Sequence, residues 1–204
     1  MDFSISNGML FAFAAMICWG FGDFLIQRST RSIGNWNTLF FITFFGTIVL
    51  TPFVYKDIIT LFQLSSYHTW IIIISAVAIL FAALFDFEAL KHGKLSIIEP
   101  ILALEVPVTA AFSMIIANEF LGTTEIILII IIMIGIILVS STFEKIKSKV
   151  VLEKGVILGL LGALLMGASN FFIGYGSRIT NPLLINWAID LFMMIVCLIY
   201  IFST

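Results

Sequence analysis

The sequence predicts an all-α polytopic membrane protein, and two observations support that prediction. Hydrophobic residues make up 61% of the 204 residues and charged residues only 11%, a composition outside the range of soluble domains. The apolar residues also gather in seven runs of about twenty, long enough to cross a hydrocarbon core roughly 30 Å thick. Each run is expected to be a helix, because a lone strand in lipid would leave its backbone groups unpaired.

The seven transmembrane helices are predicted at 8–27, 36–55, 69–90, 95–117, 125–142, 155–176 and 183–203. The first is expected to stay in the mature chain, since Met1–Ser4 lacks the basic residues that precede a cleaved signal. The connections between the spans are short and polar, so none could hold a soluble domain. Cys18 and Cys197 both lie inside predicted spans, which argues against a disulfide or a zinc site.

The chain also contains a weak internal repeat. Shifted by about 147 positions without a gap, it matches itself at about nine of about fifty positions, among them Gly20 on Gly167 and Arg31 on Arg178. About four matches would arise by chance in so apolar a sequence. The first unit holds five spans, so the second would enter the membrane from the opposite side. Such inverted repeats are typical of transporters, whose binding sites form between the repeats.

The repeat divides the chain into a five-helix unit at 7–142, a basic linker at 143–154 and the first two helices of a second unit at 155–204. Thr204 aligns with Asp57, so we expect a truncated form of a ten-helix protein with an inverted 5+5 repeat. A natural seven-span protein is the alternative. Basic residues favour one side of the membrane by eight to two, which predicts an amino terminus outside the cell.

The fourth predicted span contains the most specific local signal, two prolines and two glutamates. Pro100 and Pro107 each remove a backbone donor, so we expect a kinked helix whose freed carbonyl groups line a cavity. Glu105 and Thr109 are four residues apart and share a face, whereas Glu99 is expected nearer the membrane surface. A carboxylate deep in the bilayer costs about 3 kcal/mol or more, so Glu105 should face the bundle interior. There it binds substrate or protons, or forms an interhelical hydrogen bond that only stabilises the bundle.

Polar residues in three other predicted spans are further candidates for a substrate or proton path. Asp23 lies one turn after Trp19, and the repeat aligns it with Asn170, so these residues are expected to shape a site on the pseudo-symmetry axis. The alternative for Asp23 is a solvated carboxylate at the membrane surface. Asp190 lies in the middle of the seventh span, where an acid is expensive to place, and is expected to serve the same path.

Other conspicuous residues are expected to be structural. Asp86 and Glu88 close the third span, where ion pairing with nearby lysines is the predicted role. Helix packing of the small-xxx-small type is predicted for Gly155, Gly159 and Gly162. No nucleophile–base pair, metal-ligand spacing or phosphate-binding loop is present, so we expect no enzyme, no metal and no cofactor.

Seven residues of the chain, taken in order, resemble the motifs of a known family. They comprise an aromatic–Gly pair in the first helix, an Ala–Leu pair that closes the third, a proline in the fourth, a glutamate before the fifth and a glycine within it. They are Trp19, Gly20, Ala89, Leu90, Pro107, Glu119 and Gly135. This pattern is similar to that of the EamA domain of the drug/metabolite transporter superfamily, and it covers one complete five-helix unit and two helices of a second.

The resemblance implies a multi-pass secondary carrier in the cell membrane for small metabolites or amphiphilic compounds, with proton coupling as one mechanism. The implied partners are the lipid bilayer and a small-molecule substrate; a homodimer is left open and nucleic acid is not expected. Relatives of this type usually have a cytoplasmic amino terminus, which conflicts with the charge bias. The competing hypothesis is a non-transport assembly or interaction subunit, whose buried acids pair with the helices of a partner.

Overall fold

The computed structural model describes residues 7–142 and 154–203, and within these ranges it contains helices and no strands. Six helical segments are long and apolar enough to cross a membrane: α1 (Asn7–Ile33), α2 (Asn35–Val54), α4 (Ser66–His92), the pair α5 (Leu95–Leu102) and α6 (Glu105–Ile116), α8 (Lys154–Ile179) and α9 (Pro182–Ser203). The predicted all-α membrane class is confirmed. The predicted span 125–142 lies on α7 (Thr123–Thr142), and α3 (Ile58–Leu61) is a single turn.

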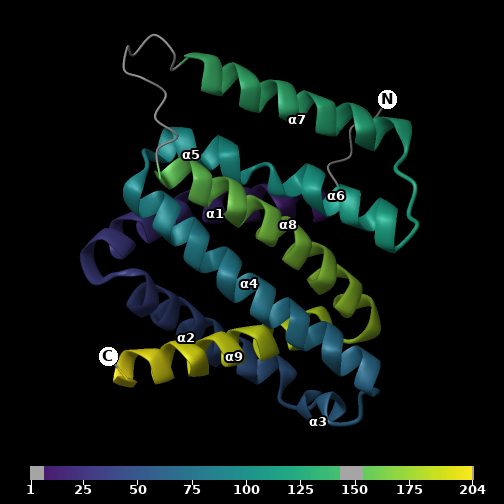
Figure 1. Ribbon diagram of the computed structural model, residues 1–204. Coiled ribbons are helices and arrows are strands. Elements are labelled where there is room, and N and C mark those ends of the chain that lie inside the picture. The colour runs from purple at the N-terminus through teal and green to yellow at the C-terminus, as the bar shows by residue number, and fades with distance from the viewer. Residues whose placement is uncertain (1–6, 143–153, 204) are drawn as a thin grey trace.

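Helix α4 is the centre of the bundle and packs along α8 (Figure 1). Small residues allow the two backbones to approach closely. Gly155 of α8 lies so near the last turn of α4 that an added Cβ would be 3.1 Å from the amide nitrogen of Gly93 and 3.2 Å from the carbonyl oxygen of Ala89. An added Cβ on Gly159 would lie 3.7 Å from the side chain of Ala89. These glycines therefore set the distance between α4 and α8.

A second contact joins α2 to α9, which lie side by side (Figure 1) and pack against α4. Its apolar core is buried and contains Leu39, Ala76, Leu80, Ala83, Phe87, Ile185, Ile189, Met193 and Cys197. One polar contact crosses it near the end of α2, where Trp187 Nε1 donates a hydrogen bond to Thr51 Oγ1 at 2.9 Å. The sequence repeat aligns α1 and α2 with α8 and α9, but the second unit itself stays a prediction. Of the predicted linker, only Lys154 lies among the described residues.

The fourth span is divided into two helices between its two prolines. Helix α5 ends at Leu102 and α6 begins at Glu105, so the division falls at residues 103–104. Proline has no N–H to donate to the carbonyl group four residues earlier. For Pro107 that acceptor is the Ala103 carbonyl oxygen, which instead takes a hydrogen bond from the Val106 amide at 3.3 Å. The division places the amino-terminal end of α6, with Glu105 in its first turn, inside the span.

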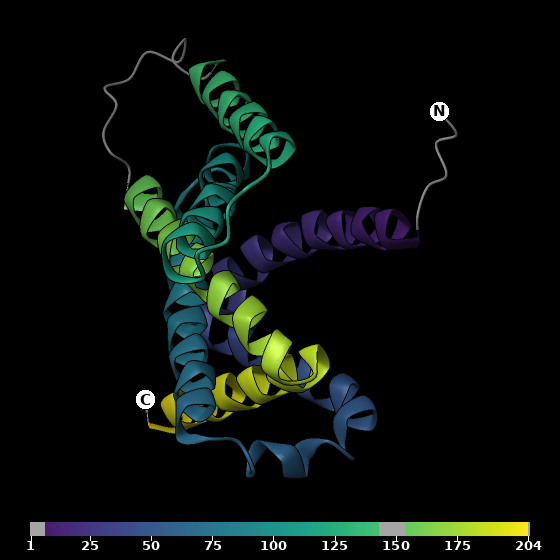
Figure 2. The same cartoon turned by 90° about the vertical axis from the view of Figure 1, so that its right-hand side faces the viewer.

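Helix α1 is joined to the bundle near its carboxyl end by hydrogen bonds to the end of α4. Arg31 donates from Nη2 to the Gly93 carbonyl oxygen at 2.7 Å and from Nε to the Lys91 carbonyl oxygen at 3.1 Å. Gln27 Nε2 donates to the Leu90 carbonyl oxygen at 3.0 Å. The last carbonyl groups of a helix have no partner within it, and a cation stabilises them. Figure 2 shows that the opposite end of α1 extends away from the other helices, where its large apolar side chains are exposed as on a lipid-facing surface.

Replacing Arg31 with alanine is expected to loosen α1 from α4. The variant loses hydrogen bonds from a charged donor, each worth at most about 1.5–3 kcal/mol after compensation by water. We expect the melting temperature in detergent to fall by several degrees, at roughly 2–4 °C per kcal/mol for a chain of this size. The matched control is Arg28→Ala, which removes the same charge from the same helix but breaks no hydrogen bond among the described residues. Equal melting temperatures for the two variants would contradict this role of Arg31.

Candidate functional site

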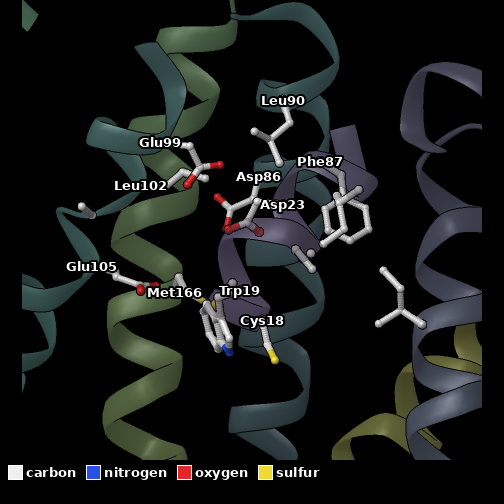
Figure 3. A pocket seen from close by; sticks show the side chains of 15 residues that line it. Cys18, Trp19, Asp23, Asp86, Phe87, Leu90, Glu99, Leu102, Glu105 and Met166 are labelled. Atoms are coloured by element: carbon white, nitrogen blue, oxygen red, sulfur yellow. The ribbon is translucent and has the colours of Figure 1, made fainter. Parts of the chain in front are cut away.

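A cavity of about 520 Å³ lies between α1, α4, α8 and the junction of α5 and α6 (Figure 3). Most of its walls are apolar. Trp19 of α1, Phe87 and Leu90 of α4, Leu102 of α5 and Met166 of α8 all line it. The volume lies within the range of pockets that hold small organic molecules, and the apolar walls are typical of such pockets.

Four carboxylic acids line the same cavity, and each comes from a different helix. They are Asp23 of α1, Asp86 of α4, Glu99 of α5 and Glu105 in the first turn of α6. In Figure 3 Asp23, Asp86 and Glu99 gather around one space, and Glu105 lies further along the cavity. None of the fifteen lining residues is a lysine, arginine or histidine. The cavity therefore concentrates acidic groups with no basic residue in its lining, in the part of a membrane protein where unpaired acids are expensive.

Asp86 is the most deeply buried of the four acids. Its residue is 7% exposed, and its Oδ1 atom has no hydrogen-bond partner among the described residues. The side chain packs against Gly162 of α8, so closely that a Cβ on that glycine would overlap the carboxylate. Glu99 is similar, because its buried Oε1 atom also has no partner in the described part of the chain. Buried polar groups in folded proteins almost always have hydrogen-bond partners, so these two oxygens call for an explanation.

Glu105, by contrast, has a partner within the protein. Asn170 Nδ2 of α8 donates a hydrogen bond to Glu105 Oε2 at 3.3 Å. One turn later on α6, Thr109 Oγ1 donates to the Gly167 carbonyl oxygen of α8 at 3.0 Å. Negative charge is also favoured near the amino-terminal end of a helix, where Glu105 lies. These contacts join α6 to α8 beside the cavity.

Comparison with known proteins identifies the family of the chain. The EamA-like transporter family matches residues 6–141, well over half of the chain. The chain belongs to this family. No match was found among curated proteins or among solved structures. The chain is thus a multi-pass membrane protein of a transporter family, as the resemblance in its motifs implies, and the match spans nearly all of the predicted five-helix unit at 7–142.

Within this EamA-family chain, the cavity contains three of the residues singled out from the sequence. Trp19, Asp23 and Glu105 all line it. Asn170 and Thr109 do not, but both contact Glu105: Asn170 donates to its carboxylate as described above, and Thr109 Oγ1 lies 2.9 Å from its backbone carbonyl oxygen, to which it donates. Asp190 lies elsewhere, at the contact of α9 with α2, where it packs against Gly46.

Sequence reasoning missed Asp86 and Glu99 as cavity residues. Asp86 does not pair with a lysine, because it lies on the face of α4 that packs on α8, next to Ala82 and Ala83. This run of small side chains on one face was the available signal. Glu88 does form an ion pair, but with Lys154 at 3.3 Å rather than with Lys91 or Lys94, and it also forms a hydrogen bond with His92 at 2.8 Å.

Glu119, the family-like glutamate before α7, serves a different contact. It forms an ion pair with Arg178 near the end of α8. The hydrogen bond from the Arg178 guanidinium holds the pKa of Glu119 below its ordinary value. Both side chains are well exposed, so the pair contributes little to stability. The ion pair therefore links the loop between α6 and α7 to α8 and takes no part in the acidic cavity.

Proposed function

We propose that the protein is a secondary carrier of the cell membrane that moves a small organic molecule through the cavity between α1, α4, the α5–α6 junction and α8. One observation carries the proposal. Four acids from four different helices meet in one cavity of substrate size, inside a membrane protein of a transporter family. Ionisable residues within a membrane are costly and mark substrate or ion pathways far more often than ordinary packing positions.

The arrangement supports binding and release in several ways. Carboxyl groups take up and release protons, so exchange of substrate against protons is part of the proposal. The division at residues 103–104 lies in the cavity wall, since Ala103 lines it, and a change of angle between α5 and α6 there would alter the cavity. Irregular backbone at membrane depth is tolerated where it lines such a cavity.

Uptake by reconstituted vesicles tests the proposal. Liposomes that contain the purified protein are incubated with an aqueous extract of small cell metabolites, and the retained compounds are identified by mass spectrometry. We expect at least one compound to accumulate above the level in protein-free liposomes. Glu105→Gln is expected to reduce that uptake by about tenfold, because a charged carboxylate accepts stronger hydrogen bonds than the neutral amide that replaces it.

Asp190→Asn is the matched control, since Asp190 is an acid that lies within a membrane span but does not line the cavity. It is expected to retain uptake. If neither variant alters uptake while both lower the yield of folded protein, the acids are structural and the assembly-subunit hypothesis is favoured. Equal loss of uptake in both variants would show that the path is not confined to the acidic cavity.

A further inference from the structure

The charge of the cavity lining restricts what the cavity can bind. Four of the lining residues are aspartate or glutamate, and no lysine, arginine or histidine in the lining offsets them. A site that selects an anion needs arginine, lysine or clustered N–H donors at its surface. This lining supplies acceptors instead, so it is complementary to a positive group.

The unpartnered oxygens restrict the ligand further. Asp86 and Glu99 both line the cavity, and one carboxylate oxygen of each, Asp86 Oδ1 and Glu99 Oε1, is buried and accepts no hydrogen bond from the described residues. Figure 3 shows the Asp86 and Glu99 side chains on the same side of the cavity, with Asp23 beside Asp86. An occupant that binds both of these carboxyl groups through hydrogen bonds must carry more than one hydrogen-bond donor. A protonated primary amine has three N–H donors, whereas a quaternary ammonium group has none.

The remainder of the lining selects the body of the ligand. No group of three or more His, Cys, Asp or Glu side chains in the described ranges is arranged to hold a metal ion. Around the acids lie Trp19, Phe87, Leu90 and Met166. Trp19 is 63% exposed, which leaves its ring available to an apolar group or to a cation over its face. The lining therefore fits an organic cation better than an inorganic one.

We propose that the cavity binds a primary organic amine with an apolar body, whose ammonium group donates hydrogen bonds to Asp86 and Glu99. The apolar body lies against Trp19, Phe87 and Met166. This inference rests on the proposed function for the route of the amine across the membrane, but binding can be measured without transport.

Calorimetric titration of the purified full chain in detergent tests the inference with 2-phenylethylamine as the probe. Two analogues of similar size serve as comparisons, neutral 2-phenylethanol and the quaternary N,N,N-trimethyl derivative of the amine. We expect the amine to bind at least about tenfold more tightly than either analogue, because a hydrogen bond to a charged group contributes about that difference in affinity. Asp86→Asn should weaken amine binding by about tenfold or more. Asp57→Asn is the control, since Asp57 lies outside the cavity and accepts a hydrogen bond from Asn181.

Three results would overturn the inference. They are equal affinity for the amine and 2-phenylethanol, equal affinity for the amine and its quaternary derivative, and an unchanged amine affinity in Asp86→Asn. The proposed function fails separately. Selective amine binding without uptake of any compound into vesicles would contradict transport and leave the binding site in place, whereas uptake of neutral or anionic compounds alone would retain transport and exclude the amine.

Discussion

Replacing Asp86 with asparagine is expected to abolish most of the transport activity while leaving the protein folded and at least as stable as the original chain. Asp86 is buried, lines the cavity and has an oxygen without a partner among the described residues. Nothing described in the protein therefore depends on its charge. A buried carboxylate costs several kcal/mol even after relaxation and water penetration, so replacing it with a neutral amide of similar shape should not destabilise the fold.

The combination of lost activity and retained stability is what separates a functional acid from a structural one. Replacing a structural acid lowers activity and stability together, because its hydrogen-bond partner is left unsatisfied. The measurement is uptake into vesicles beside the melting temperature in detergent, with Asp190→Asn as the comparison. We expect uptake to fall by about tenfold or more. A melting temperature several degrees lower, with uptake reduced only in proportion to the folded fraction, would contradict the functional role.

Replacing Gly162 with alanine is expected to lower both the stability of the bundle and the transport activity. The added Cβ would overlap the Asp86 carboxylate and lie 2.9 Å from Asp86 Cγ and 3.3 Å from the Asp86 amide nitrogen. Either α4 and α8 separate or the Asp86 side chain leaves its place. Overpacking of this kind costs about 1–3 kcal/mol, so a clear drop in melting temperature should accompany the loss of uptake.

A double-mutant cycle identifies the collision as the cause. Asp86→Ala removes the atoms nearest the new methyl group, so Gly162→Ala should cost less in the Asp86→Ala background than in the original chain. The matched control is Gly174→Ala on the same helix, where the added Cβ meets nothing within 4 Å. Alanine is the better helix former by about 1 kcal/mol, so this control should be neutral or stabilising. Additive costs in the cycle would exclude contact between the two positions as the mechanism.

Most of the fold could be predicted because the bilayer imposes simple rules on sequence. Runs of about twenty apolar residues must be helical, and six such runs correspond to helices that are long enough to cross. The predicted ends of the helices were less accurate. Helix α1 continues to Ile33 beyond the predicted end at 27, since Gln27 and Arg31 extend it to reach α4. That extension depends on a contact with a residue about sixty positions away.

The site could be predicted only in part, for a physical reason. The cost of a carboxylate in lipid depends on depth along a helix, which the sequence shows, so Glu105 and Asp23 were recognised as candidates. The face that an acid presents to its neighbours depends on how helices pack, and a single sequence does not show this. Asp86 therefore looked like the partner of a nearby lysine, and Asp190 could not be assigned to the α2–α9 contact. In each case the decisive neighbour is a glycine on another helix, Gly162 or Gly46.

The divided fourth span also constrains how the chain is assembled as it leaves the ribosome. Helices α5 and α6 contain 8 and 12 residues, or about 12 and 18 Å, so neither alone reaches across the bilayer. The residues where they meet need polar partners, and α8 supplies these through Asn170 and the Gly167 carbonyl group. Helix α8 is synthesised later than α5 and α6. We therefore expect the fourth span, formed by α5 and α6, to reach its final depth only after α8 has entered the membrane. Its insertion would then be a late event that does not follow the order of the chain.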